Sequence, residues 1–128
     1  MKKQTTLFIA TALFALAGCS TSVPIKNFEQ NLIPQTSKII NNTADVETGI
    51  LKACIQLGWQ CAPVSEGKIK GILNIRTHQL IVNINYDKTA YSINYQDSTN
   101  LNYNGSKIHR QYINWVTNLM RHIDAEMI

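Results

Sequence analysis

Between residues 68 and 96, apolar and polar side chains alternate with a period of two in three successive runs. The apolar positions are Ile69, Leu73 and Ile75, then Leu80, Val82, Ile84 and Tyr86, then Tyr91, Ile93 and Tyr95. Such a period places alternate side chains on opposite faces of a strand, and polar residues at 77–79 and 87–88 favour turns between the runs. The pattern predicts a three-stranded antiparallel meander with one polar face, although that face is rich in asparagine, a poor strand former.

Helical periodicity precedes and follows this region. Apolar residues recur at spacings of four, four and three, which predicts a helix over about 44–57; they are Val46, Ile50, Cys54 and Leu57. Asn42 or Thr43 is the expected N-cap and Gly58 the expected C-cap. A second stripe predicts a helix over about 107–125 capped by Ser106; it consists of Ile108, Tyr112, Trp115, Leu119 and Ile123. The predicted fold is α+β: helix, three-stranded antiparallel meander, helix, with both helices packed on one face of the sheet.

The first 18 residues have the three parts of an export signal. Lys2 and Lys3 precede an apolar run over 7–17 that is too short to span a bilayer, and small residues follow. The next residues, Leu16-Ala17-Gly18-Cys19, resemble the bacterial lipobox. That resemblance implies cleavage before Cys19, acylation of its thiol and amine, and a lipid anchor. Ser20, rather than Asp, then favours the outer membrane. We expect the domain on its periplasmic side, and exposure at the cell surface is the alternative. The alternative is an ordinary signal peptide (1–18) with an incidental cysteine.

The remaining chain is long enough for one small domain. Residues 19–42 contain Pro24 and Pro34 without a sustained period, which predicts a lipidated cysteine followed by a tether. Residues 43–128 are the expected α+β domain. Removal of Lys2 and Lys3 lowers Lys+Arg from 12 to 10 against 8 Asp+Glu, so the formal charge falls from +4 to +2. Because no basic stripe is present, we expect no nucleic-acid partner.

Assigning Cys19 to lipid leaves two thiols, Cys54 and Cys61. Small exported domains commonly contain disulfides. A chain that reverses at Gly58 could return Cys61 to the last turns of the first helix, so a disulfide is expected. Two buried reduced thiols are the alternative, and the spacing is not the Cys-x-x-Cys of a redox pair.

Residues with catalytic or metal-binding chemistry form no recognisable motif. His78, His109 and His122 lie far apart, without the spacing of a zinc site. Ser98 and Ser106 lack the Gly-x-Ser-x-Gly elbow of a hydrolase. No glycine-rich phosphate loop is present in the sequence. We therefore predict a protein that is not an enzyme and that holds neither metal nor cofactor.

A polar loop predicted over 97–105 is the candidate contact surface, because binding residues often lie on loops held by a rigid scaffold. Its candidate residues are Asp97, Ser98, Asn100 and Tyr103. We also hypothesise that Asp97, Ser98 or Asn100 forms a hydrogen bond to the start of the second helix.

The stretch from Tyr91 to Leu119 contains Tyr-Ser-Ile-x-Tyr, then Ser-x-Asn-Leu-x-Tyr, then Ile-His-x-x-Tyr-x-x-Trp-Val-x-Asn-Leu. In this pattern the chain resembles small bacterial outer-membrane lipoproteins of unknown function, over about residues 57–123. The resemblance implies a compact, lipid-tethered domain and carries no activity. We therefore predict a lipid-anchored envelope protein whose domain binds or scaffolds another envelope component, either a protein or a glycan. The alternative is a lipoprotein that inhibits a cell-wall-degrading enzyme or binds a soluble ligand.

Overall fold

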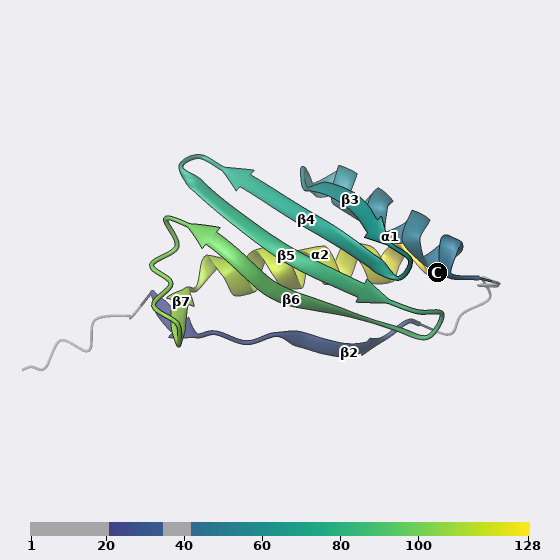
Figure 1. The fold of residues 1–128 in the computed structure, drawn as a ribbon, viewed down its shortest axis with the longest axis horizontal. Coiled ribbons are helices and arrows are strands. Elements are labelled where there is room, and N and C mark those ends of the chain that lie inside the picture. The colour runs from purple at the N-terminus through teal and green to yellow at the C-terminus, as the bar shows by residue number, and fades with distance from the viewer. Residues whose placement is uncertain (1–20, 35–41) are drawn as a thin grey trace, which may run out of the picture.

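A computed structural model describes residues 21–34 and 42–128. The elements, labelled in Figure 1, are β1 (Ser22–Pro24), β2 (Phe28–Leu32), α1 (Thr43–Leu57), β3 (Gln60–Ser65), β4 (Lys68–Ile75), β5 (His78–Tyr86), β6 (Ala90–Thr99), β7 (Lys107–His109) and α2 (Gln111–Glu126). Five strands form one antiparallel sheet in the order β2-β6-β5-β4-β3, and β1 pairs with β7 in a separate two-stranded sheet. The protein is thus α+β, but the predicted three-stranded architecture is wrong. Its three strands correspond to β4, β5 and β6, and the sheet extends on both sides of them.

The two added edge strands lack the alternation that revealed the central ones. β3 has five exposed residues among its six and contains Pro63, which an edge strand tolerates. β2 pairs with β6 through a register shift between Phe28 and Asn31. Because Phe28 and Ile33 are buried in the core, residues 21–34 are part of the domain and not the predicted tether.

The ends of α1 follow from local chemistry that the sequence contains. Asn42 and Asp45 form a reciprocal capping box, with Asp45 N donating to Asn42 Oδ1 over 3.1 Å. The helix ends at Gly58, whose φ of 76° is the left-handed conformation that glycine adopts readily. The predicted boundaries of this helix therefore lie within one residue of those observed.

The start of α2 differs from the prediction. Residues 107–109 form β7, and the helix begins only at Gln111. Ser106 does not cap it; its backbone N and its Oγ both donate to Asn104 Oδ1, over 3.0 and 3.1 Å. Ile108 fits the apolar period of the helix although it lies in β7. The reason is that β7 buries only this one of its three residues, and the buried side chain joins the same core as the helix.

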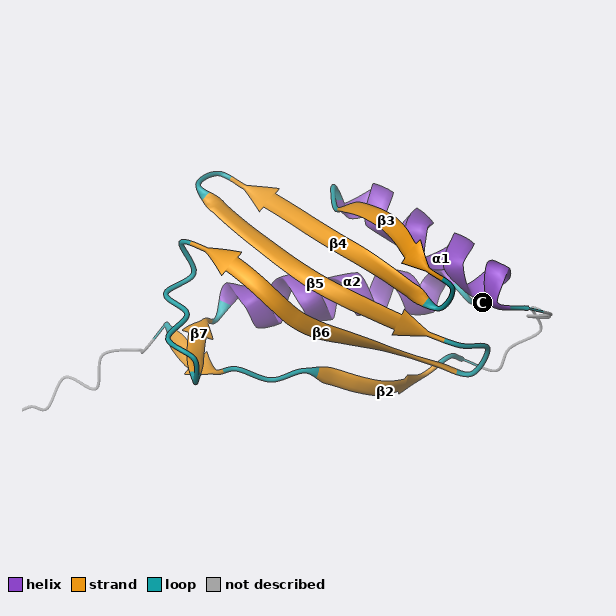
Figure 2. Cartoon of the chain, viewed as in Figure 1, coloured by secondary structure: helices purple, strands orange, loops and turns teal. Residues whose placement is uncertain are grey.

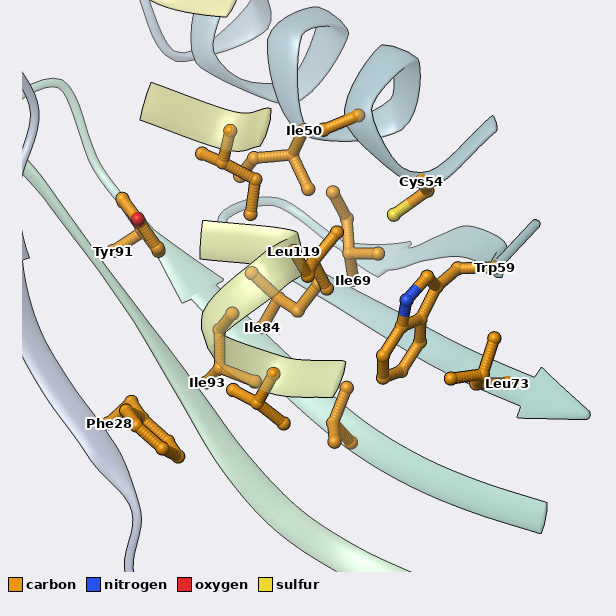
Figure 3. Packing of buried hydrophobic residues seen from close by; sticks show 14 of the residues in the cluster. Phe28, Ile50, Cys54, Trp59, Ile69, Leu73, Ile84, Tyr91, Ile93 and Leu119 are labelled. Carbon is orange, nitrogen blue, oxygen red and sulfur yellow. The ribbon is translucent and has the colours of Figure 1, made fainter. Parts of the chain in front are cut away.

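The core lies between the sheet and the helices, and Figure 3 shows its central side chains. Ile69, Leu73, Ile84 and Ile93 from the sheet meet Ile50 from α1 and Leu119 from α2. Gly71 is buried among them, and a Cβ at this position would lie 3.1 Å from Val82 Cγ2 and 3.3 Å from Cys61 Sγ. The absence of a side chain at Gly71 therefore makes room for Val82 and for the sulfur of Cys61.

A disulfide joins Cys54 at the end of α1 to Cys61 at the start of β3, with Cα atoms 6.2 Å apart. The chain turns at Gly58, and Trp59 N donates to the Cys54 carbonyl over 2.9 Å. The bridge therefore fixes the edge strand β3 to the helix beside it. Among the described residues, neither helix has the length and apolar character needed to cross a membrane.

Candidate functional site

The side chains of β4, β5 and β6 that alternate with the buried ones form an open face of the sheet. In Figure 2, no described helix lies in front of this face, and α2 passes behind the strands. The register aligns Lys70 with Asn83 and Asn94, and the next row aligns Lys68 with Asn85 and Ser92. Directly opposite residues in an antiparallel pair have Cβ atoms about 5 Å apart. The two rows therefore form a continuous polar surface, which we call the open face.

An apolar pair lies beside these rows on the same face. Ile72 of β4 is directly opposite Ile81 of β5, and both are only partly buried. Asn74 and Gln79 are paired on the far side of the isoleucines, with Gln79 Nε2 donating to Asn74 Oδ1 over 2.9 Å. Amide side chains thus flank the isoleucines along the strands, and Asp97 of β6 lies directly opposite Ile81 across the strands.

Asn94 gives the open face an unused hydrogen-bond acceptor. Its Oδ1 is buried and has no hydrogen-bond partner among the described residues. A buried acceptor without a partner costs about 1–3 kcal/mol. A rotation of the Asn94 side chain that exposed Oδ1 to a donor from a bound molecule would remove that cost.

A shallow hollow of about 240 Å³ continues the open face toward the β5–β6 turn. Asn85 and Ser92 line it from the sheet, Gln30 from the edge strand β2, and Asp87 from the turn. Three donors, from Thr89 N, Thr89 Oγ1 and Ala90 N, converge on Asp87 Oδ1 over 2.7–3.0 Å. The two backbone donors, before the hydroxyl, lower the pKa of Asp87, so the turn is held by a carboxylate.

The predicted contact loop is divided by the structure. Asp97 and Ser98 belong to β6, and only Asn100 and Tyr103 lie in the loop after it. Asn100 has a φ of 58°; its Nδ2 donates to Thr77 Oγ1 over 2.7 Å, and its carbonyl lies 2.6 Å from His78 Nδ1. Asn100 therefore joins the loop to the β4–β5 turn.

The hydrogen bond predicted between this loop and the start of the second helix is not found among the described residues, and the loop bonds β7 instead. The Leu101 carbonyl accepts from His109 N over 2.8 Å, two residues before α2 begins. The three side chains proposed for it bond elsewhere: Asp97 Oδ1 accepts from Ser98 N, Ser98 Oγ lies 2.6 Å from the Tyr95 hydroxyl, and Asn100 bonds Thr77. That hypothesis is therefore wrong. Tyr103 packs against Tyr95, with ring centroids 4.5 Å apart, and is 43% exposed.

The other strand tyrosines connect the sheet to the helices. Tyr86 donates to Glu47 Oε2 over 2.5 Å and Tyr91 to Asp124 Oδ1 over 2.8 Å. Burial, and then these hydrogen bonds, raise the pKa of Tyr86 to about 12 and raise that of Tyr91 further. Burial also raises the pKa of Tyr112, whose hydroxyl donates to the Lys26 carbonyl over 2.7 Å. These phenols hold the helices and the N-terminal segment in place. Tyr86 and Tyr91 also border the hollow, but both are buried, at 8% and 1% exposed.

The three histidines lie apart in the structure as they do in the sequence. The His78 ring is 6.1 Å from the Trp115 ring, His109 Nδ1 accepts from Gln111 N, and His122 Nδ1 lies 3.1 Å from Gln56 Oε1. Among residues 21–34 and 42–128, no three His, Cys, Asp or Glu side chains are grouped so as to hold a metal ion.

The sequence predicts the residues of the open face as the polar side of a meander and does not predict them as a site. Its signal in the sequence is asparagine at strand positions, at 83, 85 and 94. The predicted signal peptide and the predicted lipidation site Cys19 lie outside the described residues. No protein-family model matches the chain, and neither a curated protein nor a solved structure matches it.

Proposed function

We propose that this protein is a lipid-anchored component of the bacterial envelope whose open face binds another envelope protein without catalysis. The observation that carries the proposal is the pairing of Ile72 with Ile81, flanked by amides and by Lys70. A small apolar centre with a polar surround is how protein interfaces are built. Asparagine and serine supply adaptable hydrogen bonds at such surfaces.

The size of the open face favours a macromolecule over a small ligand. Pockets for small molecules usually enclose about 300–1,000 Å³, and the hollow beside Asn85 is open and smaller, at about 240 Å³. The three strands of the open face, in contrast, offer a surface of roughly 14 by 27 Å from their spacing and rise. This area is roughly half the share that one partner contributes to a standard interface.

The chemistry of the open face favours a protein over a glycan. Tyr86, Tyr91 and Tyr95 alternate toward the core, so no aromatic ring from these strands lies on the open face as a platform for a sugar ring. The partly exposed apolar side chains there are branched isoleucines, which suit an apolar side chain of a protein partner. Lys68 and Lys70 add positive charge on the β4 side and Asp97 a negative charge on the β6 side, so we expect acidic residues of the partner to face β4.

Site-specific photo-crosslinking in living cells tests the binding face. A benzophenone amino acid replaces Asn83 or Asn94 on the open face and, as the matched control, Asn118, which is exposed on α2. We expect one discrete adduct with a protein from positions 83 and 94, abolished by Ile81→Lys, and no such adduct from position 118. Equal adducts from all three positions, or adducts to glycan strands alone, would refute a protein-binding open face.

The anchor is tested separately by metabolic labelling with palmitate. We expect the wild-type chain to incorporate label and to run shorter than its precursor, because cleavage precedes Cys19 in a lipoprotein. Cys19→Ser is expected to lose the label and to accumulate as the precursor, while Cys61→Ser retains the label. A Cys19→Ser protein that is still labelled contradicts the assignment of the lipid to this cysteine.

A further inference from the structure

The described chain begins fixed to one end of the domain. The Thr21 carbonyl accepts from Arg110 N over 2.7 Å, and Ser22, Val23 and Pro24 pair with β7. Ile25 N then donates to the Ser106 carbonyl over 2.9 Å. Residue 21 is therefore held at the end of the molecule that carries β1, β7 and the start of α2, which in Figure 1 lies opposite the C-terminus.

This attachment sets a short limit on how far a lipid on Cys19 can lie from the domain. Two residues of chain reach at most about 7 Å. The headgroup layer of each leaflet is itself about 5–8 Å thick, from the difference between the full bilayer and its hydrocarbon core. We propose that the β1–β7 end of the domain rests on the headgroups of an anionic membrane surface. The proposal rests on the lipid anchor of the proposed function.

The two ends of the domain differ in charge, and the basic end is the one that this orientation places on the membrane. Residues 21–27 and 100–111 contain Lys26, Lys107 and Arg110, all exposed, and no Asp or Glu. The β4–β5 turn, joined to Asn100 through Thr77, adds exposed Arg76. The first carboxylates inward along the chain are Glu29 and Asp97. Each Lys or Arg near an anionic surface is worth about 1 kcal/mol of attraction.

The carboxylates gather at the opposite end. Six of the eight in the sequence lie at the start of α1, in the β3–β4 and β5–β6 turns and at the end of α2. They are Asp45, Glu47, Glu66, Asp87, Asp124 and Glu126. An anionic surface would attract the β1–β7 end and repel this one, so electrostatics and the anchor favour the same orientation.

Two aromatic contacts at the β1–β7 end suit contact with a layer of lipid headgroups. Tyr103 is 43% exposed in the loop beside β7 and packs against Tyr95. Lys26 Nζ lies 4.6 Å from the centre of the Phe28 ring. Tyrosine and lysine both combine an apolar body with a polar tip, which suits the boundary between lipid and water. In this orientation the open face stands to the side of the membrane, where a partner can reach it.

Photo-crosslinking to lipid tests the orientation with the full lipidated protein. The protein is reconstituted in vesicles of phosphatidylcholine and phosphatidylglycerol, with about a third of the lipid anionic. A benzophenone amino acid replaces Tyr103 at the β1–β7 end or Lys88 at the opposite end, and adducts are identified by mass. We expect the protein to float with the vesicles in both cases, and a phospholipid adduct from position 103 only.

The outcomes separate the orientation from the anchor. A protein that floats but gives no adduct from position 103, or equal adducts from both positions, overturns the orientation and leaves the anchor standing. A protein that does not float overturns both. We expect Lys26→Glu with Lys107→Glu to lower the adduct yield from position 103 by roughly fivefold or more, because both reversed charges lose their attraction to the anionic surface. The matched pair Lys68→Glu with Lys88→Glu should leave the yield unchanged; equal losses from both pairs overturn the assignment of an anionic surface.

Discussion

Reduction of the Cys54–Cys61 disulfide is expected to destabilise the domain by an amount that the loop length sets. The two cysteines are separated by seven positions, so the bridge closes a loop of eight residues. In the chain-entropy account, closing a loop of that length removes about 8 cal/mol/K from the unfolded state, or about 2.5 kcal/mol at 25 °C. For a domain of this size that corresponds to a decrease in Tm of roughly 10 °C.

Reduction and mutation separate the cross-link from the packing of its sulfur atoms. Cys54 is fully buried, so its Sγ contributes to the core whether or not it is bridged. Reduction of the wild-type protein keeps both sulfur atoms, whereas Cys54→Ala with Cys61→Ala deletes them. We therefore expect the double variant to lose about 1 kcal/mol more than reduction does, the transfer free energy of roughly one buried group of methylene size.

Urea unfolding followed by circular dichroism, with and without reductant, measures both quantities. The double variant is its own control, because reductant should not change its free energy of unfolding. Mass spectrometry after alkylation establishes that the wild-type bridge is formed before reduction and open after it. A reduced wild-type protein with an unchanged free energy of unfolding would refute the assignment of stability to the cross-link.

Four further outcomes follow from the contacts. Gly71→Ala should cost about 1–3 kcal/mol, since its Cβ would press on Val82 Cγ2 at 3.1 Å and on the bridged Cys61 Sγ at 3.3 Å; thermal unfolding measures it. Asn42→Ala should cost about 1 kcal/mol through loss of the capping box, measured by urea unfolding. Unfolded tyrosine ionises near pH 10 and Tyr86 has a pKa of about 12, so the folded state retains its proton and the free energy of unfolding should fall as pH rises from 10 to 12; urea titrations across that range would show it. Threonine at 83, 85 and 94 should raise Tm while it weakens the in-cell adduct formed from a benzophenone at position 92.

The sequence was sufficient where local chemistry and burial agree. The N-cap at Asn42, the C-cap at Gly58 and the apolar stripe between them define α1. The centres of β4, β5 and β6 follow from alternation, because each buries one face. The disulfide was accessible by the same reasoning, since the turn at Gly58 lies between its two cysteines.

Elements fixed by contacts distant in sequence could not be found in this way. β2 is held in the sheet by β6, with Asn31 Nδ2 donating to the Tyr91 carbonyl over 3.0 Å across 60 residues. β7 exists because residues 22–24 pair with it from the far end of the chain. β2 and β7 are both too short to show a period. The sequence of β2 therefore resembles a tether, and that of β7 resembles the first turn of a helix. The open face was hidden for another reason: alternation identifies a polar face without distinguishing a solvated surface from a binding surface.

The asparagines are what distinguish these two kinds of surface. Asn83 and Asn85 lie in β5, the middle strand of five, where neither an edge nor a turn requires asparagine. Threonine or valine would favour the strand at these positions. Asn94, across from Asn83, adds a buried carbonyl oxygen without a partner. Local rules are most often broken at functional sites, where stability is lost to binding. Three such residues lie on one face, beside the pair of Ile72 and Ile81. The stability that the strands lose there can therefore be compensated by contact with a partner.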